Sequence, residues 1–138
     1  MIVLDTSILV ALLDSRDAEH AGVVAWYETL DDDLVTTPLV LAEVDHLVLT
    51  RGGPATATAF HADIRSGAYA VEWWDGAATA VADIADAYAD FPLGLTDASL
   101  VAVAARIGTT RIATLDHRHF RNVKAVGGDA FTVLPADA

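Results

Sequence analysis

The sequence contains no cysteine and only one lysine among its 138 residues. Without cysteine the protein can form neither a disulfide nor a thiolate metal site, which is compatible with a reducing compartment. No uninterrupted apolar run is longer than Ile8–Leu13, which is far shorter than the roughly 20 residues that a helix needs to cross a bilayer. The first residues include no basic region, and Asp5 interrupts their apolar stretch, so no signal peptide is predicted. We therefore expect a cytoplasmic protein that does not enter a membrane.

Basic residues are scarce as well, and this limits the partners that the protein can bind. Eight basic residues stand against twenty acidic ones, which gives a formal net charge of −12. A protein of this charge repels nucleic acid unless bound divalent cations or a local basic patch reverses the field. Five of the eight basic residues do lie in the last third of the chain: Arg106, Arg111, Arg118, Arg121 and Lys124. Most of the acidic residues are interpreted as solvated surface.

Apolar residues make up 54% of the chain, enough for one packed domain spanning residues 1–138. Strands are predicted over 2–4, 34–36, 70–73, 111–115 and 131–134, and helices over 7–13, 19–30, 38–50, 55–65, 77–89 and 96–107. Ser7 is the expected N-cap of the first helix, and Thr37 followed by Pro38 is the expected start of the third. The alternation predicts a three-layer α/β fold, with helices on both faces of a mostly parallel central sheet of four to five strands.

Four acidic residues stand at positions that a parallel sheet would bring together. Asp5 and Asp116 each follow a predicted strand, while Asp97 lies in the first turn of a helix. Each of these has an ordinary explanation as a turn residue, an N-cap or a favourable charge on the helix dipole. Glu43 is harder to explain, because it lies beside the apolar stripe that begins at Val40. A carboxylate at the margin of a core is costly unless it is paired or coordinated.

Taken together, the four carboxylates predict a metal-dependent nuclease. Ligands bind beyond the carboxyl ends of the strands in sheets of this kind, and several carboxylates in one pocket repel each other unless a cation compensates. Oxygen ligands without histidine or cysteine favour Mg²⁺ or Mn²⁺. One or two such ions would activate a water and stabilise the leaving oxygen of a phosphodiester. The predicted catalytic and metal-binding residues are Asp5, Glu43, Asp97 and Asp116.

The segments around these acids resemble PIN-domain ribonucleases. The resemblance rests on Ile-Val-Leu-Asp-Thr-Ser near the start of the chain, then Thr-Pro-Leu-Val-Leu-Ala-Glu-Val, Leu-Thr-Asp-Ala-Ser-Leu-Val-Ala and Ala-Thr-Leu-Asp-His-Arg-His-Phe, in that order. It covers nearly the whole chain, and the size and motif order are similar to the toxins of VapBC toxin–antitoxin modules. It implies a PIN-like fold whose acidic quartet binds Mg²⁺ or Mn²⁺, most directly through Asp5 and Asp97. Small hydroxyl residues would support the quartet: Thr6 or Ser7, and Thr114.

The resemblance also implies an activity and partners. Such proteins cut a specific tRNA or ribosomal RNA with metal-activated water, leaving a 5′-phosphate and a 3′-hydroxyl, and a cognate VapB-type antitoxin inhibits them. A homodimer is the expected assembly. The strong acidity of this chain favours a narrow RNA target and a basic antitoxin segment. Arg118 and Arg121 are candidates for contact with RNA, with solvated surface charge as the equally weighted alternative.

Other classes of protein fit the sequence less well. A phosphatase of the haloacid-dehalogenase type would need a second aspartate where Ser7 stands and a catalytic lysine, whereas the only lysine is Lys124. A phospho-receiver domain fails for similar reasons, and no phosphate loop or His-Glu-x-x-His helix occurs. A zinc site is not expected, because His117 and His119 alternate around Arg118. The alternative that stays open is a catalytically inactive PIN-like module that binds RNA or protein.

Overall fold

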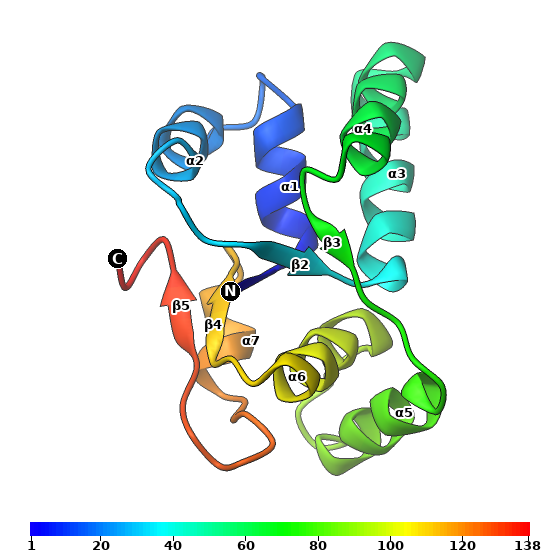
Figure 1. Ribbon diagram of the computed structural model, residues 1–138, viewed down its shortest axis with the longest axis vertical. Helices are drawn as coiled ribbons and strands as arrows, with labels where there is room; N and C mark the ends of the chain where they lie inside the picture. The colour runs from blue at the N-terminus through cyan, green and yellow to red at the C-terminus, as the bar shows by residue number, and fades with distance from the viewer.

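The computed structural model describes residues 1–138 as a five-stranded parallel sheet enclosed by helices (Figure 1). The strands are β1 (Ile2–Leu4), β2 (Leu34–Thr36), β3 (Ala70–Val71), β4 (Arg111–Ala113) and β5 (Thr132–Leu134). The helices are α1 (Thr6–Leu13), α2 (His20–Tyr27), α3 (Pro38–Gly52), α4 (Pro54–Ser66), α5 (Ala77–Ala87), α6 (Leu95–Ile107) and α7 (His117–Arg121). In Figure 1, α1 to α4 lie on one side of the sheet and α5 and α6 on the other, which confirms the predicted three layers.

The strand order is β3-β2-β1-β4-β5, and every neighbouring pair is parallel. The chain therefore begins in the middle of the sheet, runs outward to β3, and then crosses to the other side of β1. Parallel sheets bind ligands at such a reversal, beyond the carboxyl ends of the two strands that flank it. Here those strands are β1 and β4. Leu4 pairs with Ala113 at their ends, and the Asp5 N–H donates to the carbonyl of Ala113 at 3.0 Å.

The ends of α3 follow from its local chemistry. Pro38 opens the helix as predicted, and the Thr37 hydroxyl oxygen accepts from the Val40 N–H at 3.5 Å. The helix ends at Gly53, whose φ of 81° is a conformation that glycine adopts without the Cβ clash of other residues. The predicted end at residue 50 is therefore two residues short. Pro54 then begins α4 directly, so the two helices form a tight hairpin.

Most other predicted boundaries differ from the structure by one to three residues, and three of them have a clear local cause. Helix α1 begins at Thr6 with Asp5 as its N-cap, because the Asp5 carboxylate accepts from the Thr6 N–H at 2.7 Å. Helix α2 ends at Tyr27 instead of residue 30, since the Thr29 N–H and hydroxyl both turn back to the carbonyl of Trp26. Strand β3 ends at Val71, one residue before its last bond to β2.

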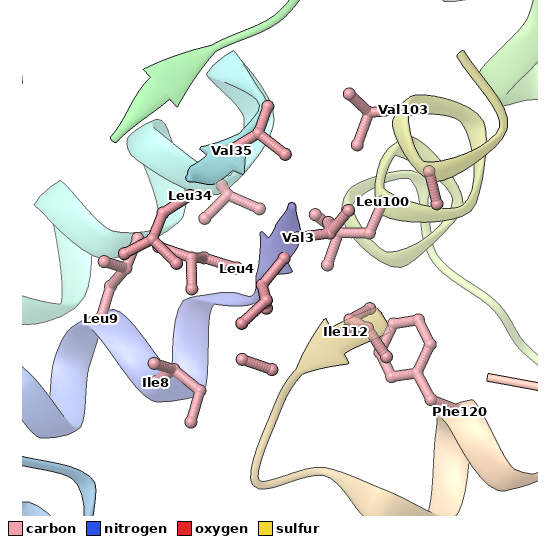
Figure 2. Packing of buried hydrophobic residues seen from close by; sticks show 14 of the residues in the cluster. Val3, Leu4, Ile8, Leu9, Leu34, Val35, Leu100, Val103, Ile112 and Phe120 are labelled. Carbon is pink, nitrogen blue, oxygen red and sulfur yellow. The ribbon is translucent and has the colours of Figure 1, made fainter. Parts of the chain in front are cut away.

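The hydrophobic core is continuous across both faces of the sheet. Figure 2 shows side chains from β1, β2, β4, α1, α6 and α7 packing around the central strand. All three residues of β1 are fully buried, as expected for a central parallel strand covered on both faces. Phe120 carries the short α7 into this core, where its ring meets that of Phe131 edge-on at 6.0 Å. No helix is long and apolar enough to span a membrane.

Candidate active site

The four predicted carboxylates line one pocket at the carboxyl edge of the sheet. Asp5 directly follows β1, Asp116 lies just beyond β4, Asp97 is in the first turn of α6, and Glu43 comes from α3. The pocket has a volume of about 650 Å³ and lies where the strand order reverses. Residues that are more than a hundred positions apart in the sequence therefore share one cavity.

Asp5 is the buried centre of this arrangement, with only 5% of its surface exposed. Its Oδ1 accepts from the Thr6 N–H at 2.7 Å, and its Oδ2 accepts from the Thr114 hydroxyl at 2.6 Å and the Ser7 hydroxyl at 3.3 Å. The Thr114 oxygen in turn accepts from the Asp116 N–H at 2.9 Å. Ser7 and Thr114, predicted as supports of the quartet, thus both donate to Asp5, whereas the buried Thr6 hydroxyl has no hydrogen-bond partner and only its backbone N–H contacts Asp5.

Burial makes the inner carboxylates hard to ionise. It raises the pKa of Asp5 to about 6; the bond from Thr114 lowers this pKa, and the nearby charges of Asp97 and Glu43 raise it. Burial also raises the pKa of Asp97, which His119 lowers in part and which the charges of Asp116 and Glu43 raise. Such shifts arise when several acids share one site without a compensating cation.

Asp116 and Asp97 both meet the imidazole of His119. The His119 Nδ1 lies 3.0 Å from an Oδ2 of each carboxylate, yet it is aligned for a good hydrogen bond with neither. The imidazole therefore acts on both acids by proximity more than through a directed bond. Asp116 occupies the N-cap position of α7, but its side chain makes no capping bond, which leaves the carboxylate free to face the pocket.

The sequence suggested that Glu43 lies at the margin of the core. In the structure it lies in the pocket, away from that margin. Its side chain is exposed, and the buried stripe of α3 consists of Val40, Val44 and Val48. Leu47, three residues after Val44, is only partly buried and lines the pocket as Glu43 does. The prediction was wrong here because helix spacing shows which residues share a face. It does not show which side of that face a neighbouring element buries.

The donor set at this site suits a hard divalent cation. Its oxygen ligands would be carboxylates, and two of them, Asp5 and Asp97, carry pKa values raised mainly by burial, which a cation would offset. In this structure, however, no three acidic or imidazole side chains surround a common point closely enough to hold an ion. Asp97 and Asp116 instead share their contacts with His119.

Comparison with known proteins identifies the family. A family model described as PIN domain matches residues 2–126. This chain belongs to the PIN-domain family. Ribonuclease VapC26 of Mycobacterium tuberculosis is 37% identical over 140 residues, covering 97% of this chain and 100% of that protein. The predicted resemblance to VapC-type PIN-domain ribonucleases is therefore confirmed.

Solved structures agree with this PIN-domain fold. The chain is similar to Mycobacterium tuberculosis VapC20, described as a sarcin-ricin loop cleaving toxin, with a TM-score of 0.76 and 24% identity over 81% of this chain and 87% of that one. It is also similar to FitAcB from Neisseria gonorrhoeae, with a TM-score of 0.62 and 20% identity over 96% of this chain and 97% of that one. At these identities the likeness concerns the fold alone.

The two arginines proposed as RNA contacts lie outside the pocket of this PIN domain. The guanidinium of Arg121 is held by both carboxylate oxygens of Asp137, with Nη1 2.9 Å from Oδ2. Arg118 is exposed and forms no ion pair, and neither residue lines the cavity. The structure therefore gives Arg121 a structural partner near the end of the chain, while contact of Arg118 with RNA stays a prediction.

Two residues of the PIN-domain pocket were missed from the sequence. His119 had been considered only as a zinc ligand beside His117, although its spacing of three residues from Asp116 places both on one side of a helical turn. Arg51 was not considered, although it follows Glu43 and Leu47 at intervals of four residues along α3. Both signals were present, but neither stands out until the pocket is known.

Proposed function

We propose that this PIN-domain protein is a metal-dependent endoribonuclease toxin that cleaves a specific structured RNA, either a tRNA or a ribosomal RNA. The observation that carries the proposal is the convergence of four carboxylates on one pocket, with Asp5 buried at its centre and its pKa raised to about 6. The names of VapC26 as a ribonuclease and VapC20 as an RNA-loop cleaving toxin support the same activity.

The proposed cofactor is Mg²⁺ or Mn²⁺. Asp5 and Asp97 are the proposed direct ligands, with Asp116 near and Glu43 acting directly or through water. When bound, the ion would activate a water and stabilise the leaving oxygen of the phosphodiester. His119 lies against Oδ2 of both Asp97 and Asp116, so Oδ1 is the oxygen of each carboxylate that the imidazole leaves to a cation.

The residues around the quartet have distinct proposed roles in hydrolysis. The Thr114 hydroxyl donates to the Asp5 carboxylate and accepts from the Asp116 backbone N–H, so one side chain aligns two acids. His119 lies 3.0 Å from both Asp97 and Asp116 and holds the pKa of Asp97 below the value that burial alone would give. In the proposed reaction, water adds across the bond between phosphorus and O3′, which leaves a 5′-phosphate and a 3′-hydroxyl.

The proposed partners are a VapB-type antitoxin and a second copy of this chain. The pocket contains five carboxylates, those of the quartet and Asp17, and an acidic cavity attracts a basic peptide segment. We therefore expect the antitoxin to place arginine or lysine near Asp5. When the chain is expressed from its native operon and purified, a second protein with a basic segment should co-purify with it. Isolation of the chain alone would argue against that partner.

Mapping of RNA ends tests the activity. The purified protein is incubated with total bacterial RNA in Mg²⁺ or Mn²⁺, and new 5′ ends are sequenced, with EDTA and Asp97→Asn samples as controls. Discrete cuts that carry 5′-phosphates and are absent from both controls would establish a metal-dependent nuclease and name its target. If no new ends arise, or if they persist in Asp97→Asn, the protein is instead a binding module.

A further inference from the structure

Arg51 is the only one of the eight arginine and lysine side chains that lines the carboxylate pocket. Four of the others are engaged within the chain: Arg16 with Asp14, Arg111 with Asp32, Arg121 with Asp137, and Arg106 over the ring of Trp74. The Arg51 side chain is exposed and forms no ion pair, although five carboxylates line the same cavity. The pocket therefore contains one free guanidinium that its acids do not neutralise.

The backbone of α3 sets the distance between this guanidinium and the catalytic carboxylates. Glu43, Leu47 and Arg51 lie at successive intervals of four residues, so they form one stripe, and all three line the pocket. Eight residues of helix span about 12 Å at roughly 1.5 Å per residue. The acidic end of the stripe thus lies with the proposed metal ligands, and its basic end lines the same cavity about two helical turns further along α3.

A single contact fixes the base of Arg51 without using its side chain. The guanidinium of Arg16, from the loop between α1 and α2, donates to the carbonyl oxygen of Arg51 and is held in turn by Asp14. The last turn of α3 is therefore tied to the neighbouring loop through its backbone. The Arg51 guanidinium itself stays available to a ligand.

We propose that Arg51 binds a backbone phosphate of the RNA substrate, away from the phosphate that is cleaved. This inference rests on the proposed ribonuclease function and adds a second anchoring point to it. A stacked strand advances about 3.4 Å per nucleotide. A separation of about 12 Å, shortened by the reach of the side chain, therefore corresponds to roughly two to three nucleotides. The stripe from Glu43 to Arg51 would then be the track along which the strand lies.

The charge distribution favours RNA over a peptide as the ligand of Arg51. A basic antitoxin segment is attracted by the carboxylates but repelled by a guanidinium at the end of the same cavity. An RNA strand is instead attracted by the guanidinium. Because the protein carries a charge of −12, which repels RNA, the strand needs a positive group where it enters the cavity. Arg51 is the residue in the pocket that meets this requirement.

Binding of a labelled RNA tests the inference, and Arg65 provides a matched control. Arg65 is also exposed, also lies in the last turn of its helix and forms no ion pair, but it is outside the pocket. The probe is a random-sequence oligoribonucleotide about a dozen nucleotides long, measured by fluorescence anisotropy between about 50 and 200 mM KCl. All variants are made in the Asp97→Asn background, so that the probe is not cut. Circular dichroism confirms that each variant keeps the parent's thermal midpoint.

We expect Arg51→Ala to weaken binding by roughly fivefold, the size of a strong exposed ion pair. It should also reduce the slope of log K against log salt by about 0.7, the value for one phosphate contact to a single strand. Arg51→Lys should keep the slope because it keeps the charge, and Arg65→Ala should change neither quantity.

Equal affinity and slope for Arg51→Ala and Arg65→Ala would overturn the inference. So would a loss of antitoxin binding by Arg51→Ala with RNA binding unchanged, since the guanidinium would then serve the protein partner. These outcomes are distinct from failure of the proposed function. If the wild-type protein cuts RNA while Arg51→Ala binds it like the parent, only the role of Arg51 is wrong; if the wild type neither binds nor cuts RNA, both proposals fall.

Discussion

Asp5 is ionisable yet almost wholly buried, so a charge on its carboxylate is costly. Its three hydrogen-bond donors, the Thr6 N–H and the hydroxyls of Ser7 and Thr114, lower the cost of a charge there without removing it. The remaining cost appears as a pKa raised to about 6. Burial of an ionisable group is costly for folding alone, and the proposed role of Asp5 as a metal ligand accounts for a carboxylate at this position.

The raised pKa predicts how stability depends on pH in the absence of metal. The pKa of Asp5 is 3.8 in the unfolded chain and about 6 in the folded protein, so the carboxyl group binds its proton more tightly when the protein is folded. Its stabilising contribution is complete below pH 3.8 and is lost as pH rises through about 6. In EDTA the free energy of unfolding should therefore fall between about pH 4 and 6, by an amount on the order of 3 kcal/mol from Asp5.

Urea unfolding of the wild type and Asp5→Asn across this range checks the prediction. The variant should show a flatter profile and exceed the wild type in stability above pH 6, because asparagine stays neutral. Asp97, whose pKa is also raised, adds to the same slope in both proteins. Asp14, Asp32 and Asp137 have pKa values lowered by hydrogen bonds to arginine, so their contribution is lost only at lower pH. Parallel profiles for the two proteins would contradict the burial of a charge at Asp5.

At the scale of single residues, the sequence identified the acids but not their surroundings. Asp5 and Asp116 could be placed because residues after parallel strands meet at one sheet edge. His119 and Arg51 could not, since their roles depend on which side of α7 and α3 faces the cavity. The exposure of Glu43 was misjudged for the same reason: spacing defines a helical face, and only tertiary packing decides what covers it.

Among the elements, α3 and α6 are joined by a buried chain of hydrogen bonds. The Ser99 hydroxyl donates to the Thr96 carbonyl at 2.6 Å, so the Thr37 hydroxyl, 2.8 Å away, donates to the Ser99 oxygen. The Thr37 oxygen accepts in turn from the Val40 N–H. This chain fixes the start of α3, which carries Glu43, against α6, which carries Asp97.

Removal of both hydroxyls of this chain should lower the free energy of unfolding by less than the sum of the two single removals. Ser99→Ala leaves the buried Thr37 hydroxyl without an acceptor and should lower the free energy of unfolding by about 1–3 kcal/mol. Thr37→Val should have a cost of similar size through loss of the cap. The double variant should lose less stability than the sum of the two single variants, because it contains neither the Thr37 nor the Ser99 hydroxyl and so leaves neither of them without its partner. Urea unfolding of the four proteins measures this coupling, and additivity to within about 0.5 kcal/mol would show that the two hydroxyls do not interact.

The elements themselves were largely predictable, whereas their order was not. Strand β2 and the start of α3 lie where the sequence placed them, because apolar spacing, Thr37 and Pro38 are local signals. The order β3-β2-β1-β4-β5 depends on pairing between segments such as β1 and β4, which are about a hundred residues apart. No local pattern records that pairing, so the sequence predicted a parallel sheet without its topology.

For the molecule as a whole, a charge of −12 opposes the binding of any polyanion. The repulsion is long-ranged, while the proposed contacts at the metal site and at Arg51 are short-ranged. Salt shortens the reach of a field from about 30 Å at 0.01 M to about 10 Å at 0.1 M. Added salt should therefore weaken the repulsion before it weakens the local contacts.

Initial rates of RNA cleavage at subsaturating substrate and saturating Mg²⁺ test this balance. We expect kcat/KM to stay constant or rise as KCl increases from about 10 to 100 mM, and to fall only at higher concentration. A nuclease that bound RNA through a broad basic surface would lose activity steeply over the whole range. A steep decline from the lowest salt would therefore place RNA binding on a surface other than the acidic pocket.

The position of β1 in the middle of the sheet has a consequence for the order in which the protein is made. Asp5 is synthesised 109 residues before Thr114, which aligns it. The central strand β1 therefore has no β4 to pair with until that later segment has been made. A nascent chain, or a fragment that stops before β4, thus lacks the aligned carboxylates, and the proposed site can form only after β4 has been translated.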